Sequence, residues 1–128
     1  MKTSKFLLCL LLLVSAVSTS FAQEKSVSEQ MASTAMTSLW RDAGAPARWT
    51  YEYGVVLKGI EGVWLSTGDG RYFSFIQKGL DSFVNADGTI RTYNVAEYNL
   101  DNINTGRSLL LLYKVTGQDK YRKAAESA

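Results

Sequence analysis

The sequence predicts an all-α fold built from helical hairpins, and two observations support this prediction. A short pattern occurs twice: Trp64 and Tyr113 each stand three residues before a Thr-Gly pair, and a tyrosine follows each of these threonines by five residues. The copies are 49 residues apart, a spacing found in helical-repeat architectures. Apolar residues also recur at helical spacing through most of the chain. Because each unit of such a repeat buries its apolar face against its neighbours, we expect packed hairpins.

The first two predicted helices flank a turn that contains Gly44 and Pro46. The first covers residues 28–42, and the second covers residues 50–66 with Thr50 as its capping residue. Apolar residues at helical spacing define one face of each helix, namely Met31, Ala35, Leu39 and Trp40 in the first and Val55, Val56, Ile60, Val63 and Trp64 in the second.

Three glycines lie inside the second predicted helix, at Gly54, Gly59 and Gly62. Each costs about 1 kcal/mol relative to alanine in a helix interior. Their presence therefore predicts that a neighbouring helix backbone or a ligand approaches this helix closely.

The remainder of the chain predicts three more helices. One covers residues 70–84, and a short extended piece over residues 89–93 separates it from a longer helix that runs from about residue 97 or 98 to 115. The last covers residues 119–128 without a capping glycine, proline or polar tail, which predicts a chain that ends within a helix. The predicted buried residues are Tyr72, Phe73, Ile76, Leu80 and Phe83 in the first of these helices, and Leu100, Ile103, Leu109, Leu110 and Tyr113 in the second.

The N-terminus has the pattern of a secretory signal peptide over residues 1–22. Lys2 and Lys5 precede an uncharged apolar run over residues 6–17, and small and polar residues then lead to Ala22, where we predict cleavage. The apolar run is shorter than the roughly 20 residues of a membrane-spanning helix, which argues against an uncleaved anchor. We therefore expect an exported protein, periplasmic or extracellular and bacterial in origin.

The predicted mature chain consists of a flexible polar leader over residues 23–30 and a domain over residues 31–128. Cys9, the only cysteine, is removed with the signal peptide, and the chain has no histidine. Disulfides, cysteine nucleophiles, histidine metal sites and Ser-His-Asp triads are therefore excluded within these residues. The pattern indicates neither a metal nor an organic cofactor.

The charge of the predicted mature chain is balanced. The formal net charge of +2 comes from Lys2 and Lys5, so their removal leaves 12 basic and 12 acidic residues. A neutral chain lacks the electrostatic footprint that nucleic acids or anionic membranes require. We expect neither partner after signal cleavage.

Three segments concentrate aromatic and acidic residues, at positions 49–54, 87–90 and 98–103. The first and third lie at predicted helix starts. Aromatic faces stack on the apolar side of a pyranose ring, while carboxylates and amides hydrogen-bond its hydroxyls. A helix N-terminus adds N–H donors and a positive dipole end that would suit a uronate carboxylate. The pattern therefore favours a sugar-binding site.

Each candidate residue also has a structural interpretation. Trp49 and Tyr51 fit a hydrophobic core or a helix-start staple as well as a sugar platform. Glu52 and Asp101 lie in first turns, where a carboxylate interacts favourably with the helix dipole. Against the structural interpretation, Asp101 lies beside Leu100 and near the predicted apolar face, where a carboxylate needs partners or a function. The residues alone leave both interpretations open.

At these segments the chain resembles the unsaturated glycuronyl hydrolases, most closely the unsaturated rhamnogalacturonyl hydrolases of glycoside hydrolase family 105, with family 88 as a relative. The resemblance covers about residues 40–128, and five motifs in order and spacing support it. They are Trp49-Thr50-Tyr51-Glu52-Tyr53-Gly54 leading to Leu57 and Gly59, Thr67-Gly68-Asp69 with Tyr72, Asp87-Gly88-Thr89-Ile90, Tyr98-Asn99-Leu100-Asp101-Asn102-Ile103 with Gly106, and Leu110-Leu111-Leu112-Tyr113 followed by Thr116-Gly117 and Tyr121.

The resemblance implies a fold, a reaction and a set of site residues. The fold is an (α/α)6 barrel of six hairpins in a ring, of which this chain would supply the first. The reaction is hydration of the C4–C5 double bond of the unsaturated galacturonic acid that ends lyase-generated rhamnogalacturonan oligosaccharides. Asp101 matches the assisting aspartate, and Tyr51, Trp49 and Leu100 are the expected substrate-binding residues. The main acid/base aspartate is expected beyond residue 128, so this chain alone is expected to be inactive.

Alternative functions remain open at this point. One keeps the fold and changes the chemistry to an unsaturated glucuronyl hydrolase or another (α/α)6 sugar enzyme, such as an epimerase. Another is a non-enzymatic helical-repeat module that binds a partner on its concave face.

Overall fold

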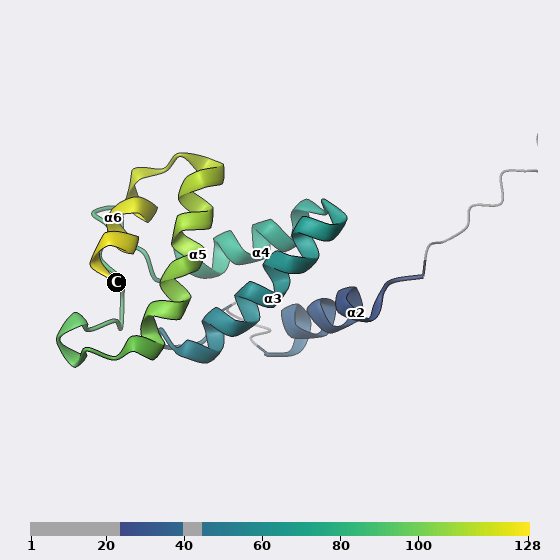
Figure 1. Ribbon diagram of the computed structural model, residues 1–128, viewed down its shortest axis with the longest axis horizontal. Helices are drawn as coiled ribbons and strands as arrows, with labels where there is room; N and C mark the ends of the chain where they lie inside the picture. The colour runs from purple at the N-terminus through teal and green to yellow at the C-terminus, as the bar shows by residue number, and fades with distance from the viewer. Residues whose placement is uncertain (1–23, 40–44) are drawn as a thin grey trace, which may run out of the picture.

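The computed structural model describes residues 24–39 and 45–128, and these residues fold into helices without a β-strand. The predicted signal peptide and cleavage site, together with Cys9 and Trp40, lie outside the described residues. The elements in chain order are α2 (Val27–Thr34), the π-helical segment η1 (Ala35–Leu39), α3 (Tyr51–Thr67), α4 (Gly70–Asp81), the 3-10 turn η2 (Val95–Glu97), α5 (Leu100–Thr116) and α6 (Asp119–Ser127) (Figure 1).

Helices α3 and α4 form one hairpin and α5 and α6 form the next, with the same turn in both. Gly68 and Gly117 adopt left-handed φ values of 69° and 68°. Each donates its N–H at 2.8 Å to the carbonyl four residues earlier, that of Trp64 or of Tyr113. In both turns the preceding threonine hydroxyl also donates to the carbonyl four residues before it, at 2.8 Å and 2.7 Å. The repeat in the sequence is therefore a repeated helix-ending structure.

The tyrosine that follows each turn is buried, and the second one joins the two hairpins. Tyr72 and Tyr121 are 4% and 0% exposed. The Tyr121 hydroxyl donates at 2.7 Å to Oδ1 of Asp81, which also accepts from Lys120 Nζ at 2.7 Å. These bonds connect α4 with α6, so this part of the repeat helps to hold neighbouring hairpins together.

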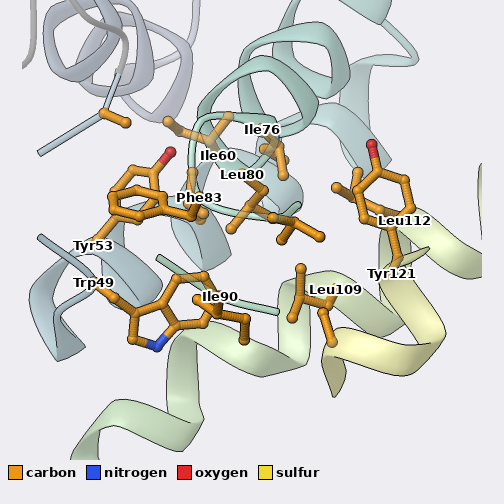
Figure 2. Close-up of a cluster of buried hydrophobic side chains, with 14 of the residues drawn as sticks. Trp49, Tyr53, Ile60, Ile76, Leu80, Phe83, Ile90, Leu109, Leu112 and Tyr121 are labelled. Carbon is orange, nitrogen blue, oxygen red and sulfur yellow. The ribbon is translucent and has the colours of Figure 1, made fainter. Parts of the chain in front are cut away.

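Helix α3 also lies beside α5, and one continuous core runs between the four helices of the hairpins (Figures 1 and 2). Tyr53 and Phe83 pack on each other at the α3–α4 side of this core, and Leu112 and Tyr121 lie at its α5–α6 side. Ile90, which follows α4 in a loop, closes the core through an antiparallel bridge with Val84. The predicted extended piece over residues 89–93 reduces to this bridge, because the chain turns at Thr92 with a φ of 66°.

The predicted buried face is confirmed in α4 but is largely wrong in α5. Tyr72, Ile76 and Leu80 are buried in α4. In α5 the buried residues are Thr105, Gly106, Ser108, Leu109 and Leu112, whereas Leu100, Ile103, Leu110 and Tyr113 are exposed. The physical reason is the close approach of α3, which requires small residues where the two helices meet. The contact face of α5 is therefore not its most apolar face.

In helix α3 the predicted buried face is also partly wrong, though less so than in α5. Ile60 and Val63 are buried as predicted, but Val55 is 47% exposed while Tyr53 and Leu57 are fully buried. The close approach predicted from its glycines is confirmed at Gly54, which lies against Thr105. At Gly59 and Gly62 an added Cβ would meet no atom of the described residues within 4 Å.

Helices α2 and α5 start at other residues than predicted, because side-chain caps fix their first residues. Helix α2 begins at Val27, one residue before the predicted start at residue 28, through a capping box between Ser26 and Glu29. Met31, which was predicted to lie on the apolar face of this helix, is 69% exposed. The residue that α2 buries is Ala32. Helix α5 begins at Leu100 rather than at 97 or 98, because the Asn99 side chain accepts from the backbone N–H of Asp101.

The stability of this fold is expected to decrease as the pH rises above about 10. Burial raises the pKa of the Tyr53 hydroxyl well above its usual range. The unfolded chain therefore loses this proton at a lower pH than the folded chain does, and stability is lost as the pH rises from the unfolded value towards the folded one. Urea denaturation at neutral and alkaline pH measures the effect.

The variant Tyr53→Phe removes this proton and should flatten the alkaline decrease. The solvent-exposed change Tyr98→Phe, at a side chain that is 88% exposed, serves as its control and should not alter the decrease. Identical pH dependence in the wild type and in Tyr53→Phe would contradict the assignment.

Candidate active site

The starts of α3 and α5 are joined by hydrogen bonds at one end of the molecule. The indole Nε1 of Trp49 donates to the carbonyl of Asn102 at 2.9 Å, and the buried hydroxyl of Thr105 donates to the carbonyl of Thr50 at 2.6 Å. The backbone N–H of Trp49 donates to the Thr92 hydroxyl at 2.8 Å, and this bond connects the loop before α5 to the start of α3. Two of the three segments singled out in the sequence, 49–54 and 98–103, are thus brought together.

Trp49 is part of the scaffold of this site. Its side chain is 3% exposed, and its ring packs edge-on against Phe83, at 5.7 Å between ring centroids (Figure 2). It also packs edge-on against Tyr93, at 6.3 Å between ring centroids. Both the ring and its N–H are used inside the fold, as the core interpretation that the sequence left open predicts. The expectation that Trp49 binds substrate stays a prediction.

Three other predicted site residues remain accessible at the joined helix starts. Asp101 lies in the first turn of α5 and is exposed, and its carboxylate forms no ion pair within the described residues. Tyr51, the first residue of α3, is 47% exposed, and Leu100 is 77% exposed. The expectation that Asp101 lies beside a buried face is corrected, since Leu100 and Ile103 on either side of it are exposed.

The third segment, residues 87–90, forms a turn with a structural role. The Asp87 carboxylate accepts from the N–H and the hydroxyl of Thr89 at 2.9 Å and 2.8 Å, and these bonds lower its pKa. Gly88 has a φ of 92° and lies so close to Lys123 that a Cβ there would overlap the Lys123 Cβ. The turn thus packs on α6.

Sequence reasoning missed three residues that build the site. Thr105 and Thr92 supply the hydroxyls that tie the two helix starts, and no local pattern marks either of them. Asn99 caps α5 and so sets where Asp101 lies in the helix. An asparagine directly before a helical run is a recognisable capping signal, so its role was available from the sequence.

The described parts of the chain contain neither a metal-binding cluster nor a membrane-spanning helix. Residues 24–39 and 45–128 contain no cluster of three or more acidic, histidine or cysteine side chains that could hold a metal ion. Among the helices of these residues, none combines the length and the apolar character needed to cross a membrane.

Comparison with known proteins identifies the family. The family model described as Glycosyl Hydrolase Family 88 matches residues 23–128, which include every helix described above. The chain belongs to glycoside hydrolase family 88. A solved structure of a family 105 glycoside hydrolase from C. acetobutylicum ATCC 824 is similar to it, with 42% sequence identity and a TM-score of 0.71. The match covers 79% of this chain and 27% of the clostridial one.

These comparisons confirm the predicted resemblance and fold. The hairpins α3–α4 and α5–α6 of this family 88 chain form part of an (α/α)6 barrel, as predicted. The chain spans about a quarter of the length of the clostridial structure, since the match covers 27% of it. The family assignment places the chain in a glycoside hydrolase family, and its activity is addressed below.

Replacing Thr105 with valine tests whether the hydrogen bond from Thr105 to Thr50, the joint between the starts of α3 and α5, contributes to stability and activity. Valine preserves the volume but removes the 2.6 Å bond to Thr50, so we expect a loss of about 1 kcal/mol in the free energy of unfolding. Thr67→Val, which removes a hydroxyl bond at the other end of α3, is the matched control. In the full-length family 88 enzyme, Thr105→Val should also lower kcat/KM severalfold, and Thr67→Val should not. Equal activity of the two variants would contradict a role for this joint.

Proposed function

We propose that these residues form the N-terminal portion of an exported hydrolase that removes unsaturated galacturonic acid from lyase-generated rhamnogalacturonan oligosaccharides. The observation that supports this best is the exposed carboxylate of Asp101, which has no ion-pair partner in the described parts of the chain and lies where the starts of α3 and α5 are joined. Membership in family 88 and the 42% identity to a family 105 enzyme supply the chemical context.

The proposed reaction consumes one water and breaks one glycosidic bond. A carboxylic acid delivers a proton to C4 of the unsaturated ring, and a water oxygen bonds to C5 while the water's second proton leaves to a carboxylate. The resulting hemiketal opens to a C5 ketone, and the hemiacetal left at C1 expels the leaving sugar as an alcohol. No oxidant or reductant is needed. One carboxyl group that first gives and then takes a proton could serve both steps.

Within this scheme, Asp101 assists at the sugar ring, and the main acid/base aspartate belongs to a part of the enzyme outside this chain. Asp101 can accept hydrogen bonds from ring hydroxyls, since its carboxylate oxygens have no other partner among the described residues. Tyr51 supplies an accessible aromatic face at the start of the neighbouring helix. The first turns of both helices add N–H groups that favour an anionic uronate.

A direct assay of the full-length polypeptide that carries these residues tests the proposal. The C4–C5 double bond absorbs ultraviolet light, so hydration is followed as loss of this absorbance. We expect turnover of an unsaturated galacturonyl-rhamnose disaccharide to exceed turnover of unsaturated glucuronyl disaccharides from glycosaminoglycans. The reverse preference would favour the glucuronyl hydrolase alternative. Saccharide binding without loss of absorbance from any substrate would favour a binding module and overturn the proposal.

Export is tested separately. N-terminal sequencing of the protein recovered from the periplasm or medium should start at Gln23, the residue after the predicted cleavage site. Recovery of the protein with Met1 retained in the cytoplasm would contradict export and leave the proposed reaction unaffected.

A further inference from the structure

The loop before α5 presents an aromatic ring at an unusual backbone position. Tyr98 adopts a left-handed conformation, with φ 48° and ψ 34°, between the 3-10 turn η2 and the capping residue Asn99. Its N–H donates to the Val95 carbonyl at 3.1 Å, which holds this conformation in place. Glycine or asparagine would adopt the same conformation more easily, because a larger side chain is strained there.

The described residues make little use of the Tyr98 side chain. It is 88% exposed, more than any other large apolar or aromatic side chain in the described residues. Within the same residues, its hydroxyl forms no hydrogen bond and its ring stacks on no other aromatic ring. An exposed ring at a strained position, without a structural benefit, is typical of a functional site.

The position of Tyr98 relates it to the proposed reaction centre. Tyr98 lines a largely apolar pocket together with Tyr93, Val95, Ile103 and other residues. Asp101 follows Tyr98 by three residues, across the Asn99 cap, in the first turn of α5. Tyr98 is thus on the loop directly before the helix that carries Asp101.

We propose that the ring of Tyr98 is a stacking platform for the sugar next to the unsaturated uronide, which is the leaving group of the reaction. This inference rests on the proposed function. In this arrangement the terminal uronide binds at Asp101, and the sugar that follows it lies over the loop that carries Tyr98. The apolar face of that pyranose can pack on an exposed aromatic ring, which contributes binding without taking part in the chemistry.

Two substrates and two variants of the full-length enzyme test this role. The substrates are the unsaturated galacturonyl-rhamnose disaccharide and the methyl glycoside of the same uronide, which lacks the second sugar. Tyr98→Leu should lower kcat/KM on the disaccharide about tenfold, mainly through a higher KM, and leave the methyl glycoside within about twofold of wild type. Tyr98→Phe keeps the ring and should behave as the wild type on both substrates. The thermal melting temperature of both variants should stay at the wild-type value.

The outcomes separate this inference from the function on which it rests. Unchanged kinetics of Tyr98→Leu on the disaccharide would overturn the platform and leave the proposed function intact. An equal loss on both substrates, or a lowered melting temperature, would also overturn it by showing a role in the uronide site or in folding. A wild-type enzyme inactive on both substrates would overturn the proposed function and the platform together.

Discussion

Replacing Gly54 with alanine is expected to lower the free energy of unfolding by about 3 kcal/mol. A Cβ at this position would lie 2.6 Å from the Thr105 hydroxyl oxygen and 2.8 Å from both Cα and N of Thr105. A side chain can rotate away from such a contact, but the backbone atoms of Thr105 can move only if α3 and α5 separate. The separation would also break the bond from Thr105 to Thr50 that joins the helix starts. Chemical denaturation followed by circular dichroism measures the loss.

Gly59 provides a matched control for Gly54 because it lies in the same helix. A Cβ at Gly59 meets no described atom within 4 Å, so alanine there should keep or increase stability, by up to about 1 kcal/mol from its higher helix propensity. If Gly54→Ala and Gly59→Ala have the same effect, helix propensity and not contact with α5 determines the response. That result would contradict the close packing described here.

Replacing Asp101 with asparagine is expected to lower the turnover of the full-length enzyme on the unsaturated disaccharide by at least about 100-fold. Asparagine retains the size of the side chain but removes the negative charge and one acceptor oxygen from the site. The folded structure should change little, since Asp101 is exposed and the cap of α5 comes from Asn99. Turnover is measured at saturating substrate, and the melting temperature is recorded beside it.

Asp119 allows the same chemical change at another helix start. It lies in the first turn of α6, where its carboxylate pairs with Arg122 at 2.7 Å. Asp119→Asn should therefore affect stability slightly and turnover not at all. Wild-type turnover in Asp101→Asn would remove Asp101 from the proposed mechanism. Equal losses in both variants would point to a general effect of charge at helix starts.

The candidate site shows where local sequence information was sufficient and where it was not. The residues around Asp101 and Tyr51 were found because aromatic and acidic residues gather at two helix starts. Trp49 belongs to the same motif by sequence, yet it is 3% exposed while Tyr51, two residues later, is 47% exposed. Local pattern cannot separate them, because the difference arises from Phe83 and Tyr93, which reach Trp49 from distant parts of the chain.

The buried face of α5 was predicted wrongly for a related reason. Apolar periodicity favoured Leu100, Ile103 and Leu110, all of which are exposed, while Thr105 is fully buried. Hydrophobicity predicts which residues can be buried. The distance between the packed helices determines which of them are in fact buried. Where α3 approaches as closely as it does at Gly54, only small side chains fit between the helices.

The sequence by itself determined the hairpin architecture, because its causes are local. Gly68 and Gly117 end their helices through a left-handed residue and a bond to a carbonyl four residues earlier, and both features depend on neighbours along the chain. Only the tertiary structure decided which aromatic residues at the site are accessible and which small residues join α3 to α5. Those properties arise from contacts such as Trp49 with Asn102, whose partners are far apart in the sequence and meet only when the hairpins pack.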